Sequence, residues 1–536
     1  MNKIFHFIFA LLISCVAVYA QEIEYSQPVN NPESCTSIMV GKKASTDGSV
    51  MTSHTCDGNY RTWMNIVPAM KYEWDTVVGI YNGLMHTEFT ADRTNVKLKG
   101  TIPQVRATYQ FLNTAYPCLN EKQLGIGETT ITGRRELINK NGMFMIEELE
   151  RIALERCTTA RQSIKLMGEL VEKYGYADAG ECLTIADPKE VWHFEIFGEG
   201  PNKIGGVWAA IRIPDDHVGV SANISRISTL NVKDTDNCMA SANVFDVAKK
   251  LGYWDGKEPF SFWRAYSVGN YMGEKKAFGI REYFILSYLA PSLKLSYDAE
   301  ELPISVKPDN PVSVTTVMSL LRQTYEDTDW DMTKNLKVAV KRRDSDIRDT
   351  IISNSANPWM TTDMVNMLNG IKDGTVTRMR LVSVPQCSYS HVIQLRDWLP
   401  DAVGGVAWMS LDNPGQSPRF PVFCGGTELP ESFNICGEHR FREDASLWAF
   451  RCTNKLSTVR WGLTKNMMNK AIMHFENKGQ NELSFVESMY NKVLKAEGTE
   501  IANEYLGNYT SDFIGATMMK WKELGNTFWK MFARGF

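Results

Sequence analysis

Three consecutive stretches between residues 181 and 213 constrain the fold most strongly, because each of them alternates apolar and polar residues. They cover residues 181–185, 190–197 and 206–213, and the turn-forming stretches Asp187-Pro188 and 214–216 follow the first and the last of them. Alternation with a period of two is typical of strands that have one buried face. The sequence therefore predicts three strands joined by short connections.

Helical periodicity precedes these strands. Apolar residues recur at helical spacing over residues 145–174, with an interruption at Thr158-Thr159, which predicts two helices. Earlier still, residues 36–40 and 50–53 have strand character, and the Asp-Gly pair in the intervening stretch 44–48 favours a hairpin. A chain that runs from strands to helices and back to strands predicts an α+β fold.

The carboxyl-terminal part is predicted to be helical. Residues 485–494 place apolar side chains on one side of a helix, which indicates an amphipathic helix packed on the rest of the molecule. No repeat or low-complexity linker divides the chain. We therefore expect one large domain over residues 35–460 and a helical segment over residues 461–536 that packs on the same domain.

The amino-terminal stretch has the pattern of a secretory signal peptide over residues 1–20, followed by a propeptide over residues 21–34. Lys3 precedes the apolar run 4–18, and Val18-Tyr19-Ala20, which are small residues or residues tolerated at a cleavage site, stand before Gln21. Two alternatives stay open: a buried apolar strand, and a lipoprotein signal with its anchor at Cys15. The apolar run is short for a membrane span. We expect export to the periplasm or the extracellular space.

Composition narrows the classes of function. The chain has 536 residues, 43% of them hydrophobic and 22% charged, with a formal net charge of −4. It has no basic run or stripe of basic and aromatic residues, so nucleic-acid binding is not predicted. A small molecule or a peptide is the expected partner.

The cysteines give no sign of a metal site. The sequence has eleven of them. Cys15 lies in the predicted signal peptide and Cys35 directly follows the predicted propeptide, and nine cysteines remain when these two are set aside. Nine is an odd number, so at least one thiol is unpaired. Their spacings include no zinc-type set of cysteine and histidine. Cys424 and Cys436 are either a disulfide or a pair of buried reduced thiols.

Three stretches in order resemble one enzyme family. They are CTSIMVGKKASTDGSVM from Cys35, LNEKQLGIGETTITGR from Leu119, and ECLTIADPKEVWHFEIFGEG with GVWAAIRIPDDHVGVSANISRI between residues 181 and 227. They resemble the peptidase-D-type cysteine dipeptidases, which are N-terminal-nucleophile (Ntn) hydrolases and distant relatives of penicillin V acylase and bile salt hydrolase. The resemblance is thinner from residue 228 to about residue 460 and is not evident beyond. It implies a four-layer αββα sandwich with an additional carboxyl-terminal helical segment.

The resemblance also implies the chemistry of Cys35. A free α-amine has a pKa of about 7.7 to 8.0, so an amino-terminal cysteine supplies both the nucleophile and the base. The leader would then have to be removed at the Ser34–Cys35 bond, and we expect Cys35 to make this cut itself. No cofactor or metal is implied. The competing interpretation is that Cys35 is a small buried core residue.

Five further residues are site candidates by resemblance. Asp57 would orient the amine of the nucleophile, or form a turn beside Gly58; Asn120 would donate into an oxyanion hole, or belong to a plain turn. Asn223 would hold the amine or the substrate; it also begins a glycosylation sequon, which a buried residue could not use. His54 stands where the family usually has arginine, so the positive charge near the thiolate is in question. Arg264 is a candidate later arginine of the site, or a surface residue in an ion pair.

Three functions follow from these residues. The first is a secreted cysteine dipeptidase acting on dipeptides or short peptides with a free amino end. The second is an amidase or acylase of the penicillin V acylase or bile salt hydrolase type. The third, from another class, is an inactive peptide-binding homologue. Many members of such families assemble, so a homo-oligomer stays an open alternative, although no motif indicates an interface.

Overall fold

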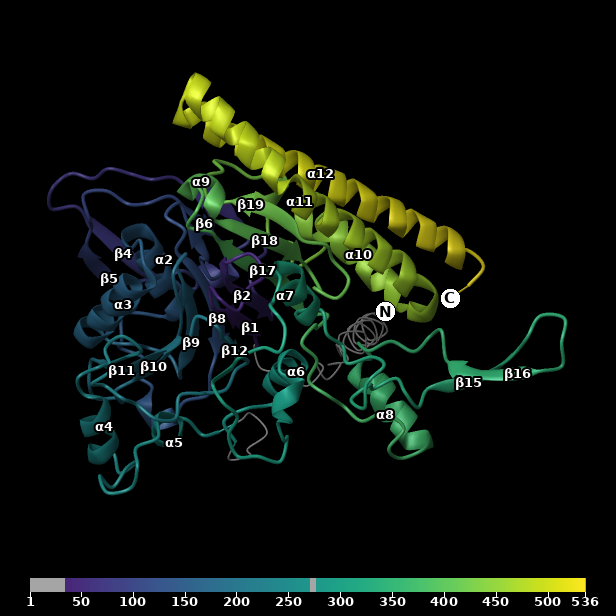
Figure 1. Ribbon diagram of the computed structural model, residues 1–536, viewed down its shortest axis with the longest axis horizontal. Helices are drawn as coiled ribbons and strands as arrows, with labels where there is room; N and C mark the ends of the chain where they lie inside the picture. The colour runs from purple at the N-terminus through teal and green to yellow at the C-terminus, as the bar shows by residue number, and fades with distance from the viewer. Residues whose placement is uncertain (1–33, 270–275, 536) are drawn as a thin grey trace, which may run out of the picture.

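The computed structural model describes residues 34–269 and 276–535, and two large sheets form its centre (Figure 1). The predicted signal peptide, Cys15 and the predicted propeptide up to residue 33 lie outside the described residues. The first sheet has the order β14 (Ser305–Val306), β12 (Val218–Ser221), β1 (Ser37–Val40), β2 (Val50–Asp57), β17 (Cys387–Leu395), β18 (Val406–Leu411) and β19 (Phe420–Phe423). The second has the order β13 (Cys238–Ala240), β11 (Gly206–Ile213), β10 (Val191–Gly198), β9 (Glu181–Ala186), β8 (Gly125–Thr130), β7 (Leu119–Asn120), β6 (Phe111–Asn113) and β3 (Asn65–Val67).

Neighbouring strands in both sheets are antiparallel. The predicted amino-terminal hairpin is confirmed as β1 and β2, and the three predicted strands are confirmed as β9, β10 and β11. Two smaller hairpins, β4 (Val77–Asn82) with β5 (Lys97–Pro103) and β15 (Lys337–Lys341) with β16 (Arg348–Ile352), lie apart from the two sheets. The second of them projects from the body of the molecule in Figure 1.

The two large sheets pack face to face near β1, β2, β8 and β9. Thr52 Oγ1 in β2 lies 3.0 Å from the carbonyl oxygen of Thr184 in β9, and Ser37 Oγ in β1 lies 2.5 Å from Thr184 Oγ1. A side chain at position 127 would not fit, because a Cβ atom added to Gly127 would lie 2.1 Å from the carbonyl oxygen of Ser53. The sheets therefore approach closely next to the start of β1, where Cys35 lies.

The predicted helix pair covers the outer face of the second sheet. It consists of α2 (Ile146–Arg156) and α3 (Ala160–Tyr174), and the Thr159 side chain caps α3 by accepting a hydrogen bond from the Gln162 backbone. Gly168 in α3 leaves room for the indole of Trp208 in β11, because a Cβ atom there would lie 2.5 Å from that ring. The helix break thus arises from local capping, and the position of α3 arises from its packing on the sheet.

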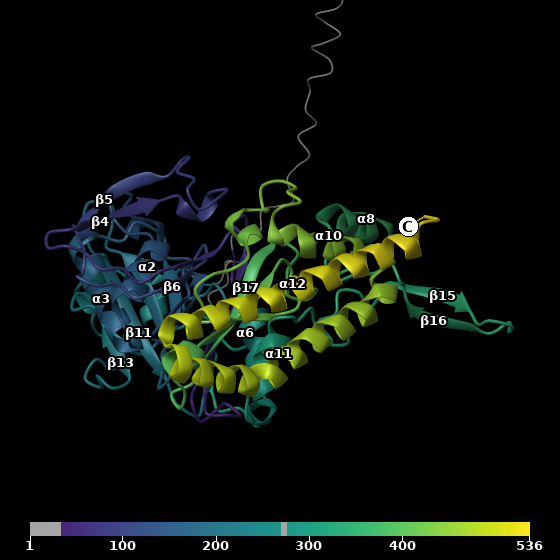
Figure 2. The same ribbon diagram turned by 90° about the horizontal axis from the view of Figure 1, so that it is seen from above.

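Three helices cover the far side of the first sheet: α10 (Ser446–Thr458), α11 (Trp461–Glu497) and α12 (Thr499–Phe532). Figure 2 shows α11 and α12 as two long neighbouring helices. Thr510 in α12 donates a hydrogen bond to the carbonyl oxygen of Pro421 in β19, and Thr453 in α10 donates one to Trp521 in α12. The amphipathic helix predicted over residues 485–494 is confirmed as part of α11, which begins much earlier in the chain.

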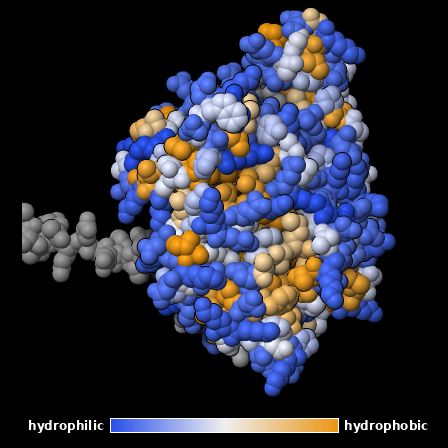
Figure 3. Space-filling model, turned by 90° about the vertical axis from the view of Figure 1, so that its left-hand side faces the viewer, coloured by the Kyte–Doolittle hydropathy of each residue, from blue (hydrophilic) through white to orange (hydrophobic). Residues whose placement is uncertain are grey.

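The remaining elements are short. They are α4 (Val244–Lys250), α5 (Phe262–Tyr266), α6 (Ile280–Leu289), α7 (Val314–Leu320), α8 (Thr362–Ile371), α9 (Asp401–Gly404), η1 (Leu84–His86), η2 (Arg135–Leu137), η3 (Pro291–Leu293) and η4 (Glu431–Asn434). Among the described residues, no helix has the length and apolar character that crossing a membrane requires. The face seen in Figure 3 is largely hydrophilic, with separate apolar patches.

The fold is α+β, with antiparallel sheets and a carboxyl-terminal helical segment, as the sequence predicts. Cys424 and Cys436 are both buried free thiols, so the disulfide alternative is wrong and the reduced alternative is confirmed. Burial raises the pKa of the Cys424 thiol to about 12, which keeps it protonated.

Candidate active site

The strand register brings Cys35 opposite Asn223. In the antiparallel pair of β1 and β12, Ser37 lies opposite Ser221. Cys35 stands two residues before Ser37, and Asn223 stands two residues after Ser221, so the two residues extend from the same end of this strand pair. The backbone N–H of Cys35 donates a hydrogen bond to Asn223 Oδ1 at 2.9 Å, and the cysteine side chain is fully buried. Residues far apart in sequence therefore meet because β1 and β12 are neighbours in the sheet.

Arg281 in α6 donates hydrogen bonds to both chain segments that meet here, the one at Cys35 and the one at Asn223. Its Nη1 donates to the carbonyl oxygen of Cys35 at 2.6 Å and to Thr36 Oγ1 at 3.0 Å. Its Nη2 donates to the Ala222 carbonyl oxygen at 2.9 Å and to Asn223 Oδ1 at 2.8 Å. This buried guanidinium fixes the main chain of Cys35 and the orientation of the asparagine amide.

Asn223 has both ends of its amide engaged. Oδ1 accepts from Cys35 and Arg281, and Nδ2 donates to the carbonyl oxygen of Thr130 at 2.7 Å. Its φ of 67° lies in the left-handed region, which residues with a Cβ adopt at an energetic cost. The buried side chain is therefore held as an acceptor for the Cys35 nitrogen, and its sequon is not accessible to a glycan.

Asp57 lies at the end of β2 and pairs with Arg380. The Arg380 Nη2 atom lies 2.9 Å from Asp57 Oδ2 and also contacts the hydroxyl of Ser34. The backbone N–H of Ser34 donates to the carbonyl oxygen of Asp57 at 3.0 Å. Burial raises the pKa of the Asp57 carboxyl, and the charge of Arg380 acts in the opposite direction. A buried ion pair thus lies beside the Ser34–Cys35 peptide bond.

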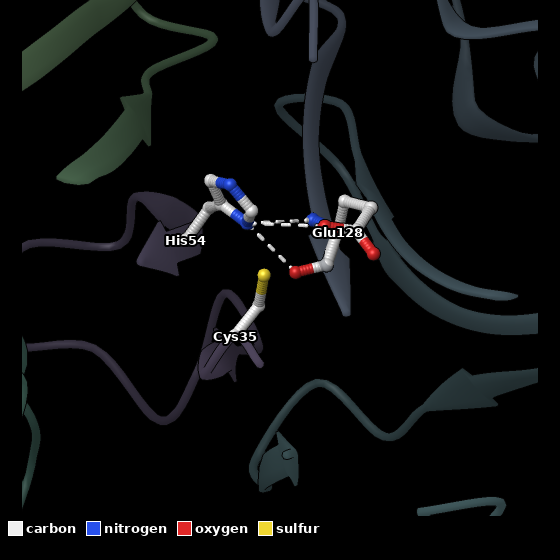
Figure 4. Close-up of side chains that lie close together, drawn as sticks. All are labelled: Cys35, His54 and Glu128. Carbon is white, nitrogen blue, oxygen red and sulfur yellow. Dashed lines mark hydrogen bonds and ion pairs between the residues drawn. The ribbon is translucent and has the colours of Figure 1, made fainter. Parts of the chain in front are cut away.

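His54 in β2 and Glu128 in β8 face Cys35 from two sheets (Figure 4). The Nδ1 atom of His54 lies 2.7 Å from the Glu128 carbonyl oxygen and 3.8 Å from its Oε2 atom. Burial lowers the pKa of His54 to about 4, so the imidazole is neutral near pH 7. The histidine does not supply the positive charge that the family arginine would carry.

The same three residues bring together atoms that can ligate a metal. One ligand atom each from Cys35, His54 and Glu128 lies within 4.8 Å of the others. Thiolate, imidazole and carboxylate are all zinc ligands. Binding through His54 Nδ1 would displace its hydrogen bond to the Glu128 carbonyl oxygen.

The Cys35 thiol lies in surroundings that disfavour its ionised form. Burial raises its pKa well above the usual value, and the charges of Glu128 and Asp57 add to this effect, whereas a hydrogen bond from the Asp57 backbone opposes it. In the described chain the Cys35 nitrogen is a peptide amide, which cannot accept a proton. Removal of Ser34 would create an amine on the same residue as the thiol, and its positive form would favour the thiolate.

Asn120 makes its hydrogen bonds away from Cys35. Its Nδ2 donates to the carbonyl oxygens of Leu154 and Cys157, both at 2.9 Å, at the end of α2. Its Oδ1 accepts from the backbone of Lys122 and Leu124, both at 3.0 Å. Both amide hydrogens are therefore committed to protein acceptors, and these contacts do not support the predicted oxyanion role.

Arg264 has a surface role. Its side chain is 46% exposed and forms ion pairs with Glu300 and Glu301. This is the alternative that the sequence left open for it. The arginines beside Cys35 are instead Arg281 and Arg380.

Sequence reasoning missed three residues at this site, namely Arg281, Arg380 and Glu128. Arg281 stands in an apolar helical stretch, and a buried arginine in such a stretch signals a buried partner. Glu128 lies in the stretch GIGETT of β8, where a carboxylate interrupts buried positions. Arg380 lies in a loop before β17, with no periodic pattern to mark it.

Comparison with known proteins identifies the family of this chain. Residues 34–474 match the family model of Peptidase family C69. A probable dipeptidase of Latilactobacillus sakei is 26% identical over 418 residues, which cover 74% of this chain and 76% of the relative. A probable dipeptidase of Salmonella dublin is 28% identical over 411 residues (73% and 81%), and dipeptidase A of Lactobacillus helveticus is 19% identical over 456 residues (80% and 82%). Because the family model matches most of its length, the chain belongs to peptidase family C69.

Proposed function

We propose that this protein is an exported cysteine dipeptidase that uses Cys35, freed at its amino end, as an N-terminal nucleophile. The observation that carries the proposal is the pair of contacts on the Cys35 main chain. Asn223 accepts from its nitrogen, and Arg281 donates to its carbonyl oxygen. A cysteine needed only for packing would not require this fixed nitrogen, whereas a nucleophile that uses its own amine as base does. The face-to-face sheets with helices outside support the Ntn class.

The reaction follows from the groups around the sulfur. The free amine takes the thiol proton, and the thiolate attacks the carbonyl carbon of the dipeptide to form a C–S bond. The protonated amine then gives its proton to the leaving amine as the C–N bond breaks. Water resolves the thioester, releasing the first amino acid and restoring the thiol. The tetrahedral intermediate requires N–H donors. One hydrogen on Asn223 Nδ2 goes to the Thr130 carbonyl oxygen, and we assign the second hydrogen on this atom, in place of Asn120, to the intermediate.

The precursor would use the same nucleophile on its own chain. The Cys35 thiol attacks the carbonyl carbon of Ser34, the C–N bond breaks, and the Cys35 nitrogen takes up the thiol proton. Water then hydrolyses the thioester and releases the leader as a carboxylate. Arg380, which contacts the Ser34 hydroxyl and lies 3.5 Å from its carbonyl oxygen, supports the negative charge that develops there.

Intact-mass measurement and a substrate panel test the proposal. Wild-type protein is expected to begin at Cys35 and to hydrolyse dipeptides faster than acyl-amides such as phenoxyacetyl amides. Cys35→Ala is expected to keep Ser34 and to be inactive. Cys452→Ala removes an exposed thiol and is the matched control, with processing and activity unchanged.

Two results would contradict it. Wild-type protein that hydrolyses dipeptides while still carrying Ser34 would exclude the free amine as base. Absence of dipeptide turnover in fully processed protein would exclude the dipeptidase function, and turnover of acyl-amides alone would favour an acylase.

A further inference from the structure

A buried carboxylate faces the nucleophile from the opposite sheet. Glu128 lies in β8, and one of its oxygens is within 4.8 Å of the Cys35 sulfur (Figure 4). Its Oε1 atom accepts a hydrogen bond from Thr130 at 3.2 Å, while Oε2 lies on the side of His54. The side chain is fully buried.

A second acid supports this carboxylate. Burial raises the pKa of Glu181 well above its usual value, and the neighbouring Glu128 carboxylate adds to this effect. The protonated form of Glu181 is therefore favoured, and a protonated carboxyl can donate a hydrogen bond to a neighbouring carboxylate.

The distances suit a substrate with a free amino end. Attack on a carbonyl requires the reacting atoms to be about 3 to 3.5 Å apart. In an amino-terminal residue the ammonium nitrogen lies about 2.5 Å from the carbonyl carbon, because only two bonds separate them. The ammonium group therefore lies within about 6 Å of the sulfur during attack. A carboxylate oxygen within 4.8 Å of that sulfur can reach it.

The charge of Glu128 by itself works against the thiolate. After burial, it is the largest influence that raises the pKa of the Cys35 thiol. A cation bound against the carboxylate would cancel this effect. His54 does not provide that cation near neutral pH, because burial lowers its pKa to about 4. An ammonium group arriving with the substrate would neutralise Glu128 at the moment when the thiol must ionise.

We propose that Glu128 binds the α-ammonium group of the residue whose carbonyl carbon is attacked, and so restricts this enzyme to peptides with a free amino end. The inference rests on the proposed function, since it takes Cys35 as the nucleophile. Glu128 is then the residue that separates a dipeptidase from an acylase in this site. An acylated substrate brings no ammonium group to this carboxylate and so forfeits the charge-assisted contact that the free dipeptide makes.

Glu128→Gln tests this assignment with one dipeptide and its N-acetyl form. In processed wild type, kcat/KM is expected to be at least about 100-fold higher for the free dipeptide. In processed Glu128→Gln, kcat/KM for the free dipeptide falls about 100-fold or more, while the value for the acetylated form stays within about threefold or rises. Glu150→Gln is the matched control. Burial raises the pKa of Glu150 well above its usual value, so glutamine resembles its protonated form and both rates should be unchanged.

A second measurement serves if Glu128→Gln does not process. The wild-type KM for the free dipeptide should rise above pH 8, where the substrate ammonium loses its proton, while the KM for the acetylated form should not. Equal falls for both substrates in Glu128→Gln, or parallel KM profiles in wild type, would overturn the assignment. Dipeptide turnover with an unchanged preference in Glu128→Gln would refute this inference alone. Absence of dipeptide turnover in processed wild type would instead refute the proposed function.

Discussion

Replacement of His54 by asparagine tests whether the imidazole beside Cys35 is neutral. In the structure, His54 Nδ1 lies 2.7 Å from the carbonyl oxygen of Glu128, and the ring packs against Tyr116 and His391, with ring centroids 5.5 and 5.4 Å away. An asparagine amide can donate to the same carbonyl oxygen, so the change keeps this hydrogen bond and removes the titratable ring.

The expected magnitude follows from the shifted pKa. Burial lowers the pKa of His54 from 6.5 to about 4, so the folded state binds a proton less readily than the unfolded state. The neutral, buried imidazole therefore contributes fully to the free energy of unfolding above pH 6.5, and this contribution is lost as the pH falls toward 4. At 1.36 kcal/mol for each pKa unit, about 2.5 kcal/mol of this stability is lost between pH 7.5 and pH 4.5, and the remainder is lost below pH 4.5.

Urea unfolding at pH 7.5 and pH 4.5 measures this loss, with every variant placed in the Cys35→Ala background so that processing does not differ. His54→Asn should lose about 2.5 kcal/mol less than the parent between the two pH values. His474→Asn, which removes an exposed imidazole of α11, should lose as much as the parent. The same loss in His54→Asn and in the parent would refute a neutral buried imidazole, and would restore His54 as a candidate cation for the thiolate.

Three further replacements test the groups around the nucleophile. Arg281→Met removes the donors that hold the Cys35 main chain, so kcat/KM for dipeptides should fall at least about 100-fold, whereas Arg264→Met at the surface should leave it unchanged. Arg380→Met leaves the buried Asp57 carboxylate without its cation. Its pKa should rise further, and urea unfolding should show about 3 to 5 kcal/mol less stability at pH 7 and a smaller loss at pH 4, where the carboxyl binds a proton; equal stability at pH 7 would contradict the ion pair. Asn120→Ala leaves two buried carbonyl oxygens without donors, so it should lower stability by about 1 to 3 kcal/mol while kcat stays within about threefold. A large fall in kcat at unchanged stability would return the oxyanion role to this residue.

The sequence by itself determined the parts of the fold that depend on neighbours along the chain. The period-two pattern predicted β9, β10 and β11, and the Asp-Gly turn predicted the hairpin of β1 and β2. Thr159 marked the break between α2 and α3, because it caps α3 through a residue three positions away. Such features need no knowledge of long-range packing, since strand pleat, turn geometry and helix caps are set within a few residues.

Tertiary structure decided which polar groups serve the site. Arg281 and Arg380 reach the Ser34–Cys35 segment across 246 and 346 residues of sequence, and only the packing of α6 and of the loop before β17 brings them there. Asn120, in a stretch that resembles the family, has its amide taken by the end of α2. A buried polar side chain must satisfy its hydrogen bonds with whichever partners the fold places within reach. The residue type gives its capacity to donate or accept, but the partner, and with it the function, depends on strands and helices that meet only in the folded molecule.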